Sequence, residues 1–279
     1  MIIDFHTHIF PDKIAQKAIN GLKSASHVKN HADGTAADLV RSMERSGVCL
    51  SVIQPVAVKP ENVVSINNIS IERSGRDNLI YFGCMHPDFT DYDAELRRLR
   101  DSGIKGIKLH PVSQDTDLDD ARYLRIMERC LEYGLIVLVH GGTDLSLPDR
   151  VRSTPKMAEN ALRQVGEVSL VMAHMGGHHF WDDVPVLAQY DNVYIDTSTS
   201  LGKIISIDGY YSEEEKMMLS DEEFCRVVRL FGANRTLFAS DSPWSDQKRS
   251  IDDIMALPLS DSEKELIFSK NAMRLLKLN

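Results

Sequence analysis

Eight short apolar runs, separated by polar segments with helical spacing, constrain the fold more than any other feature of this sequence. The runs are rich in β-branched and aliphatic residues, and the helical segments stop near glycines, which is the pattern of parallel βαβ units. The predicted strands cover residues 2–10, 48–57, 79–87, 103–111, 135–142, 168–177, 192–198 and 236–244. Eight is the number of such units that closes a (β/α)₈ TIM barrel. We therefore expect an α/β fold with one barrel domain over residues 1–279.

Helices are predicted where apolar spacing and capping residues coincide. They cover residues 36–47, 91–103, 117–134 and 261–279, with Asp33 or Thr35 capping the first and Ser260 or Asp261 opening the last. Two connections, residues 11–35 and 199–221, are longer than the others. They follow the first and seventh strands, where barrel loops build active sites, so we interpret them as candidate lids. The lid side chains of interest are His27, His31, Tyr210 and Tyr211.

Charge and composition narrow the range of partners. The chain has 41 acidic and 32 basic residues, a formal net charge of -9, which argues against a general nucleic-acid binder and favours a small-molecule partner. No apolar stretch approaches the roughly 18 residues that span a bilayer, and no room for an export signal precedes the first motif. The four scattered cysteines are expected to be buried thiols, and the expected location is the cytoplasm.

The first predicted strand carries the sequence "DFHTH", residues 4–8. Side chains at positions i and i+2 share one face of a strand, so Asp4, His6 and His8 point the same way. Buried polar groups need partners, and a cation would supply one for all three. Taken alone, the pattern fits two hydrogen-bonded core histidines as well as it fits two metal ligands.

Other predicted strands end in the same chemistry. "LIVLVH" is apolar up to His140, "LVMAH" up to His174 and "LFASD" up to Asp241. The carboxyl ends of barrel strands converge on one mouth, so these groups are expected to meet there. His6, His8, His140 and Asp241 then form a complete set of imidazole and carboxylate ligands for a divalent metal, with zinc as the expected ion and manganese or another divalent ion as the alternative.

With these motifs in place, the chain resembles the amidohydrolase superfamily end to end. The resemblance rests on "DFHTH", on "GIKLHP" at the fourth strand, on His140, on "AHMGG" with His174, on "SDSPW" with Asp241, and on the closing "NAMRLLKL". The branch resembled includes aminocarboxymuconate-semialdehyde decarboxylase, γ-resorcylate decarboxylase and pyrone-dicarboxylate lactonase. The resemblance implies that His6, His8, His140 and Asp241 ligate one metal, with His174 beside it as an acid/base or polarising group.

The resemblance also raises the question of Lys108, because binuclear members of the superfamily carry a carboxylated lysine on the fourth strand. Strand parity places Lys108 and His110 on the inward face. Lys108 is then a metal-bridging carbamate, an ammonium that binds a substrate carboxylate, or the partner of a buried acid such as Asp4. The branch resembled usually holds one metal, so a second is not expected.

Further side chains are candidates to contact substrate. His86 and His110 each end a strand before a proline, where a hydrogen-bonded turn histidine is the competing interpretation. One of His178 and His179 is expected to face the site, and we favour His178. Trp244 is expected to line the site. Strand parity also turns inward Tyr194, Asp196 and Ser198. Asp4 is expected to support the metal ligands.

Three functions fit these residues. The first is a metal-dependent hydrolase of a small, carboxylated or cyclic ester, lactone or amide, in which a metal-activated water attacks and Asp241 or His174 moves the proton. The second is a non-oxidative decarboxylase of a carboxylated aromatic or muconate-like acid at the same site. The third is a metal-stabilised barrel without activity. Barrels of this branch are often dimers, so the resemblance also implies a homodimer.

Overall fold

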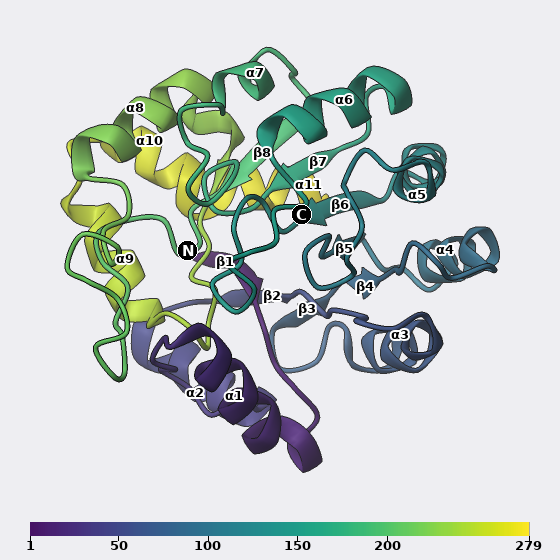
Figure 1. The fold of residues 1–279 in the computed structure, drawn as a ribbon, viewed down its shortest axis with the longest axis horizontal. Coiled ribbons are helices and arrows are strands. Elements are labelled where there is room, and N and C mark those ends of the chain that lie inside the picture. The colour runs from purple at the N-terminus through teal and green to yellow at the C-terminus, as the bar shows by residue number, and fades with distance from the viewer. Residues whose placement is uncertain (279) are drawn as a thin grey trace. The chain divides into compact units, whose positions relative to one another are not determined.

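The computed structural model describes residues 1–278 of the chain. They form two compact units of parallel strands and helices (Figure 1). Unit 1 consists of Met1–Ile53, Leu145–Pro148 and Asp196–Asn279. Unit 2 consists of Gln54–Asp144 and Asp149–Ile195.

Unit 1 is organised around the buried strand β1 (Ile3–Thr7). β1 pairs in parallel with β2 (Leu50–Ile53), and the backbone N–H of Phe5 donates to the Phe238 carbonyl, at 2.9 Å, just after β9 (Thr236–Leu237). The Asp241 N–H donates to the His6 carbonyl, at 2.9 Å, and the His8 N–H donates to the Ser242 carbonyl, at 2.6 Å. The chain after β9 therefore runs beside the end of β1, which brings their polar residues together.

The helices of unit 1 begin where the sequence supplies caps. The Ser220 hydroxyl accepts from the Glu223 N–H and the Ser260 hydroxyl from the Glu263 N–H, and in both cases the glutamate reaches back to the cap, completing a capping box. Thr35, one of the two predicted caps, caps α2 without a capping box, because its hydroxyl accepts from the Asp38 N–H. The helices are α1 (Asp12–Ser26), α2 (Ala36–Ser46), α8 (Asp221–Phe231), α9 (Gln247–Ala256), α10 (Asp261–Glu265) and α11 (Asn271–Leu276), with a 3₁₀ turn η2 (Ala233–Arg235) and a π-helical turn η3 (Leu266–Lys270).

Unit 2 contains a run of parallel strands whose residues are almost all buried, as expected when helices cover a parallel sheet. Neighbours in the sheet follow chain order from β4 to β8, so each strand pairs with the next one. The strands are β3 (Leu79–Tyr81), β4 (Gly83–Cys84), β5 (Gly106–Leu109), β6 (Ile136–Val139), β7 (Leu170–Met172) and β8 (Val193–Asp196), whose last residue belongs to unit 1.

The helices of unit 2 alternate with these strands, which is the right order for βα units. They are η1 (Pro60–Asn62), α3 (Val63–Arg73), α4 (Tyr92–Asp101), α5 (Ala121–Tyr133), α6 (Pro155–Val165) and α7 (Pro185–Ala188). α5 begins at the side-chain cap Asp120 and ends at Gly134, which adopts the left-handed conformation that glycine reaches without strain. α4 ends at Asp101 with Ser102 as its C-cap, two residues before Gly103, the end of the predicted helix.

All eight predicted strands are found, each with a shorter hydrogen-bonded core than its apolar run, and the third is divided into β3 and β4. The division falls at Phe82, two residues before Cys84, whose backbone groups bond to a side chain of α3. The Asn67 side chain accepts from the Cys84 N–H, at 2.8 Å, and donates to the Cys84 carbonyl, at 3.1 Å. A side-chain amide on a helix cannot be predicted from the alternation of apolar residues along the strand.

The prediction that all four cysteines are buried is wrong for Cys49. Cys84, Cys130 and Cys225 are buried, and burial raises the pKa of each of these thiols, but Cys49 is exposed. It lies between Gly47, which ends α2 in the left-handed conformation, and the start of β2. The apolar neighbours that suggested burial belong to the strand, whereas Cys49 precedes it.

The two long connections of unit 1 pair with each other. An antiparallel bridge joins Val28 to Ser206. The rings of His27 and Tyr210 are stacked, with their centroids 3.9 Å apart. Nδ1 of His27 lies 2.7 Å from Oδ2 of Asp208. The Tyr211 hydroxyl donates to the Ser26 carbonyl, at 2.8 Å. Much of residues 11–35 is helix α1 rather than a loop, and its C-terminal end makes these contacts.

No helix among residues 1–278 has the length and apolar character required to cross a membrane.

Candidate metal centre and histidine cluster

In unit 1, the end of β1 and the segment after β9 bring together His6, His8 and Asp241. The two histidine Nε2 atoms lie 3.0 Å apart, and Oδ1 of Asp241 lies 3.3 Å from Nε2 of His8 and 3.6 Å from Nε2 of His6. Ligand atoms bound at about 2.1 Å around one tetrahedral ion are separated by roughly 3.4 Å. These three atoms therefore have the spacing and the chemistry of a divalent metal site, and we call the three residues the metal triad.

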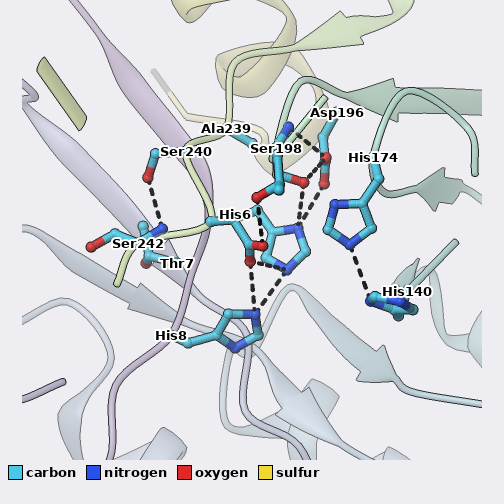
Figure 2. A network of polar contacts seen from close by, with 12 residues as sticks. His6, Thr7, His8, His140, His174, Asp196, Ser198, Ala239, Ser240 and Ser242 are labelled. Atoms are coloured by element: carbon cyan, nitrogen blue, oxygen red, sulfur yellow. Dashed lines mark hydrogen bonds and ion pairs between the residues drawn. The ribbon is translucent and has the colours of Figure 1, made fainter. Parts of the chain in front are cut away.

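Two contacts orient the metal triad. The Asp196 carboxylate lies 2.9 Å from Nδ1 of His6, with the Ser198 hydroxyl beside it, as Figure 2 shows. The Thr199 hydroxyl donates to Oδ2 of Asp241, at 2.9 Å, which leaves Oδ1 for the side of the histidines. Asp196 and Ser198 were predicted to point inward, and Thr199 was missed because a threonine in a loop carries no periodic signal.

Asp4, which was predicted to support the metal ligands, makes hydrogen bonds to the backbone beside them and to two further side chains. Its carboxylate accepts from the backbone N–H of His6, at 3.3 Å, and of Ser240, at 2.9 Å, and from the side chains of Ser240, at 2.5 Å, and Gln247, at 2.8 Å. Burial raises the pKa of Asp4 to about 6, and the hydrogen bonds oppose part of that rise. Asp4 thus ties β1 to the chain that carries Asp241 and to helix α9.

Unit 2 contains a second group of polar side chains, at the ends of its strands: His110, Asp144, His140, His174 and His178, which we call the histidine cluster. Nε2 of His174 lies 3.1 Å from Nδ1 of His140, a contact drawn in Figure 2. The His140 ring stacks on the His110 ring, with centroids 4.3 Å apart, and Nε2 of His110 lies 3.6 Å from Oδ2 of Asp144. The sequence interpretation missed Asp144, although it follows "HGGT" directly.

The environment of the histidine cluster favours a neutral imidazole at His140. Burial lowers the pKa of His140 well below its ordinary value, and the neighbouring His110 and His174 lower it further. A neutral imidazole is the form that binds a metal or accepts a proton. His178 is buried, whereas His179 is exposed, which distinguishes the two adjacent histidines.

Close backbone packing explains the glycines after His140. A Cβ at Gly142 would lie 2.2 Å from the His178 carbonyl oxygen and 2.4 Å from the His178 nitrogen. The two segments form a parallel bridge, in which the His178 N–H donates to the Gly141 carbonyl, at 2.9 Å, and the Thr143 N–H to the His178 carbonyl, at 3.0 Å. "HGG" and "HMGG" are therefore sequences that let two strand ends approach each other.

Two predicted site residues have unusual backbones. His174 has φ 60 and Asp241 has φ 65, in the left-handed region that side chains other than glycine rarely adopt. Such conformations cost on the order of 1–3 kcal/mol and concentrate at functional sites. The observation is independent of the side-chain pattern that first identified these residues.

The remaining candidates have varied surroundings. Lys108 is 1% exposed on β5, at a position opposite Leu138 in the sheet. His86 is buried and its Nδ1 accepts from the Asp88 N–H, at 3.1 Å, so it has the hydrogen-bonded turn that was its competing interpretation. Trp244 lines a pocket of unit 1 together with His31 and Thr199, among other residues.

The described units thus have the parallel strands of a βα protein, with histidines and aspartates at the strand ends. A model of the amidohydrolase family matches residues 3–278, and the chain belongs to this family. No curated protein was found to be a sequence relative of the chain.

Solved structures resemble the chain over nearly its whole length. An uncharacterised TIM-barrel protein from Bordetella bronchiseptica has a TM-score of 0.72 at 16% identity, covering 99% of this chain and 98% of that one. A dihydroxybenzoic acid decarboxylase from Polaromonas, crystallised with manganese and an inhibitor, has a TM-score of 0.71 at 15% identity, covering 100% of this chain and 97% of that one. A Pseudomonas putida protein assigned as a 2-pyrone-4,6-dicarboxylic acid hydrolase has a TM-score of 0.66 at 20% identity, covering 99% of this chain and 97% of that one.

These likenesses confirm two predictions. The α/β TIM-barrel fold is that of the matched structures. The predicted family is confirmed by the family model, and the matched structures include decarboxylases and a protein assigned as a pyrone-dicarboxylate hydrolase, the kinds of enzyme that the prediction named.

Proposed function

We propose that this protein is a metal-dependent hydrolase of a small carboxylated or cyclic substrate, an ester, lactone or amide. The observation that carries the proposal is the metal triad, whose three ligand atoms face one another at 3.0–3.6 Å. Membership of the amidohydrolase family supports the proposal that the protein is an enzyme, and the structurally similar proteins act on small molecules according to their names. We further propose His140 as a fourth ligand, on the sequence argument that barrel strand ends share one face.

One divalent ion is proposed, zinc on the chemistry of the imidazole ligands or manganese on the example of the crystallised decarboxylase. The group His110, His140 and Asp144 also has ligand spacing. However, the His110 and His140 rings are stacked, with 14° between their planes. Lone pairs that lie in parallel ring planes run side by side rather than converge, so this group does not support a second ion.

When bound, the metal supplies Lewis acidity, which polarises a substrate carbonyl and lowers the pKa of bound water. The side chains are proposed to move the protons and to bind the substrate. Asp241, whose Oδ1 is the oxygen of the metal triad, would accept a proton from the attacking water on Oδ2, the oxygen to which Thr199 donates. His174 delivers a proton to the leaving group. Lys108 is the proposed partner of a substrate carboxylate, with His110 as a further donor.

A non-oxidative decarboxylase is the second candidate, and it is favoured by the relatives, several of which are named as decarboxylases. In that reaction His174 would manage the proton at carbon, and Asp241 would serve as a ligand. Both reactions use the same residues, so the products decide between them.

The test is a screen of metal-loaded protein against lactones, esters, amides and carboxylated aromatic acids. Acid release without carbon dioxide supports the hydrolase, and carbon dioxide release supports the decarboxylase. The His174→Ala variant is expected to keep its metal and lose turnover, whereas His179→Ala, which changes the exposed neighbour, should retain both. Turnover that survives His174→Ala would contradict the role proposed for His174.

A further inference from the structure

Asp196 and His6 form a fully buried pair in unit 1. Both side chains have 0% exposure, and Oδ2 of Asp196 lies 2.9 Å from Nδ1 of His6. Asp196 is the last residue of β8, and His6 lies in β1. Removing a carboxylate from water costs several kcal/mol, so a buried carboxylate needs compensating partners. The partners that it has indicate what it does.

The two nitrogens of the His6 ring face different surroundings. Nδ1 faces Asp196, while Nε2 lies 3.0 Å from Nε2 of His8 and 3.6 Å from Oδ1 of Asp241. An ionised carboxylate only accepts hydrogen bonds, so Nδ1 must carry a proton. In a neutral imidazole the lone pair is then on Nε2, the atom that faces the other members of the metal triad.

Ser198 holds the carboxylate in the orientation that this requires. Its hydroxyl donates to Oδ1 of Asp196, and its backbone N–H donates to the same oxygen at 3.1 Å. These donors occupy Oδ1, which leaves Oδ2 for the imidazole of His6. The turn from residue 196 to residue 198 is visible above the His6 ring in Figure 2.

We propose that Asp196 is a positioning residue for the metal. It fixes His6 in the tautomer with the proton on Nδ1, holds the ring toward the triad and increases the basicity of Nε2. The inference rests on the proposed metal site and adds a carboxylate–histidine–metal arrangement to it. In metalloproteins, outer carboxylates of this kind contribute about 10–100-fold to metal affinity.

The pair of Asp208 and His27 provides a control in the same unit. Oδ2 of Asp208 lies 2.7 Å from Nδ1 of His27, so it is also a carboxylate that faces an imidazole, but His27 does not belong to the metal triad. If the loss of any carboxylate–histidine contact in the unit weakened metal binding, Asp208→Asn and Asp196→Asn would act alike. A positioning role predicts that they differ.

The first test measures the dissociation constant of Mn²⁺ and of Zn²⁺ by competition with a chromophoric chelator. Metal-free wild type, Asp196→Asn, Ser198→Ala and Asp208→Asn are compared, with folding checked by far-UV circular dichroism. Asp196→Asn is expected to weaken binding by about 10–100-fold, Ser198→Ala in the same direction by less, and Asp208→Asn by no more than about threefold. Equal affinity in wild type and folded Asp196→Asn would overturn the proposal, as would equal losses in Asp196→Asn and Asp208→Asn.

The second test does not depend on metal binding. Nitrogen NMR of metal-free protein labelled at histidine, with His6 identified by its loss in His6→Gln, reports which ring nitrogen carries the proton. Wild type is expected to show His6 with its proton on Nδ1 alone, and a proton on Nε2 would overturn the proposal even if Asp196→Asn failed to fold. A wild type with this tautomer that bound no metal would contradict the proposed function instead.

Discussion

Replacing Gly142 with alanine tests how closely the strand ends of unit 2 must approach each other. The new methyl group would lie 2.2 Å from the His178 carbonyl oxygen and 2.4 Å from the His178 nitrogen. Both are backbone atoms, so no side-chain rotation can relieve the overlap. The bridge between Gly142 and His178 must therefore open, and the backbone that carries the histidine cluster must move with it.

The magnitude follows from two contributions. Gly142 has φ 80, and a left-handed conformation costs a residue with a Cβ roughly 1–2 kcal/mol. Opening the bridge also breaks the hydrogen bonds from His178 to Gly141 and from Thr143 to His178, each with a net value of about 1 kcal/mol. Together they predict that Gly142→Ala lowers the free energy of unfolding by roughly 3–4 kcal/mol.

Gly134→Ala is the matched control in the same unit. Gly134 has φ 65, but nothing lies within 4 Å of a Cβ placed there, so only the conformational cost of about 1–2 kcal/mol applies. Urea unfolding followed by circular dichroism gives both values. Equal destabilisation by the two substitutions would refute the argument from close packing.

Three further predictions address other features. In the native protein, Cys49 should react with a thiol reagent at once, while the other three cysteines should react only on unfolding; a second fast thiol would contradict the burial described. Burial lowers the pKa of His86, so its neutral form is favoured by folding, and its contribution to stability is complete above about pH 6.5 and decreases as the pH falls toward the lowered pKa. In urea titrations, the free energy of unfolding of His86→Gln should therefore fall less steeply than that of wild type as the pH decreases below about 6.5. An equal dependence on pH in the two proteins would refute this. Asp208→Asn removes the partner of His27, so limited proteolysis within residues 199–221 should become faster. An unchanged rate of cleavage would show that the contact between the two long connections does not protect this segment.

The sequence was sufficient to predict the strands and most helix ends, for identifiable physical reasons. Parallel strands covered on both faces have continuous apolar runs, and residues such as Thr35 and Ser260 mark helix starts through their own hydrogen bonds. The third predicted strand is divided beside the contact between Cys84 and Asn67 of a helix, and the exposure of Cys49 depends on where its strand begins. Both are tertiary properties, which local periodicity does not encode.

The candidate site was predictable to a similar extent. His6, His8 and Asp241 were found because an imidazole or carboxylate at the end of an apolar strand is conspicuous. The geometry adds the partners of these residues: Asp196 faces the ring of His6, and Thr199 holds Asp241. Strand parity placed Asp196 on the inward face, but only distances distinguish a carboxylate that contacts an imidazole from one, such as Asp4, that binds backbone N–H groups.

Metal content tests the central claim most directly. Protein purified without chelators and supplied with zinc or manganese is analysed by elemental mass spectrometry, beside His8→Ala, Asp241→Asn and the control His179→Ala. We expect about one tightly bound divalent ion per chain in wild type and in His179→Ala, and loss of that ion in the two triad variants. Less than about half an equivalent in wild type, or full retention in His8→Ala and Asp241→Asn, would contradict it.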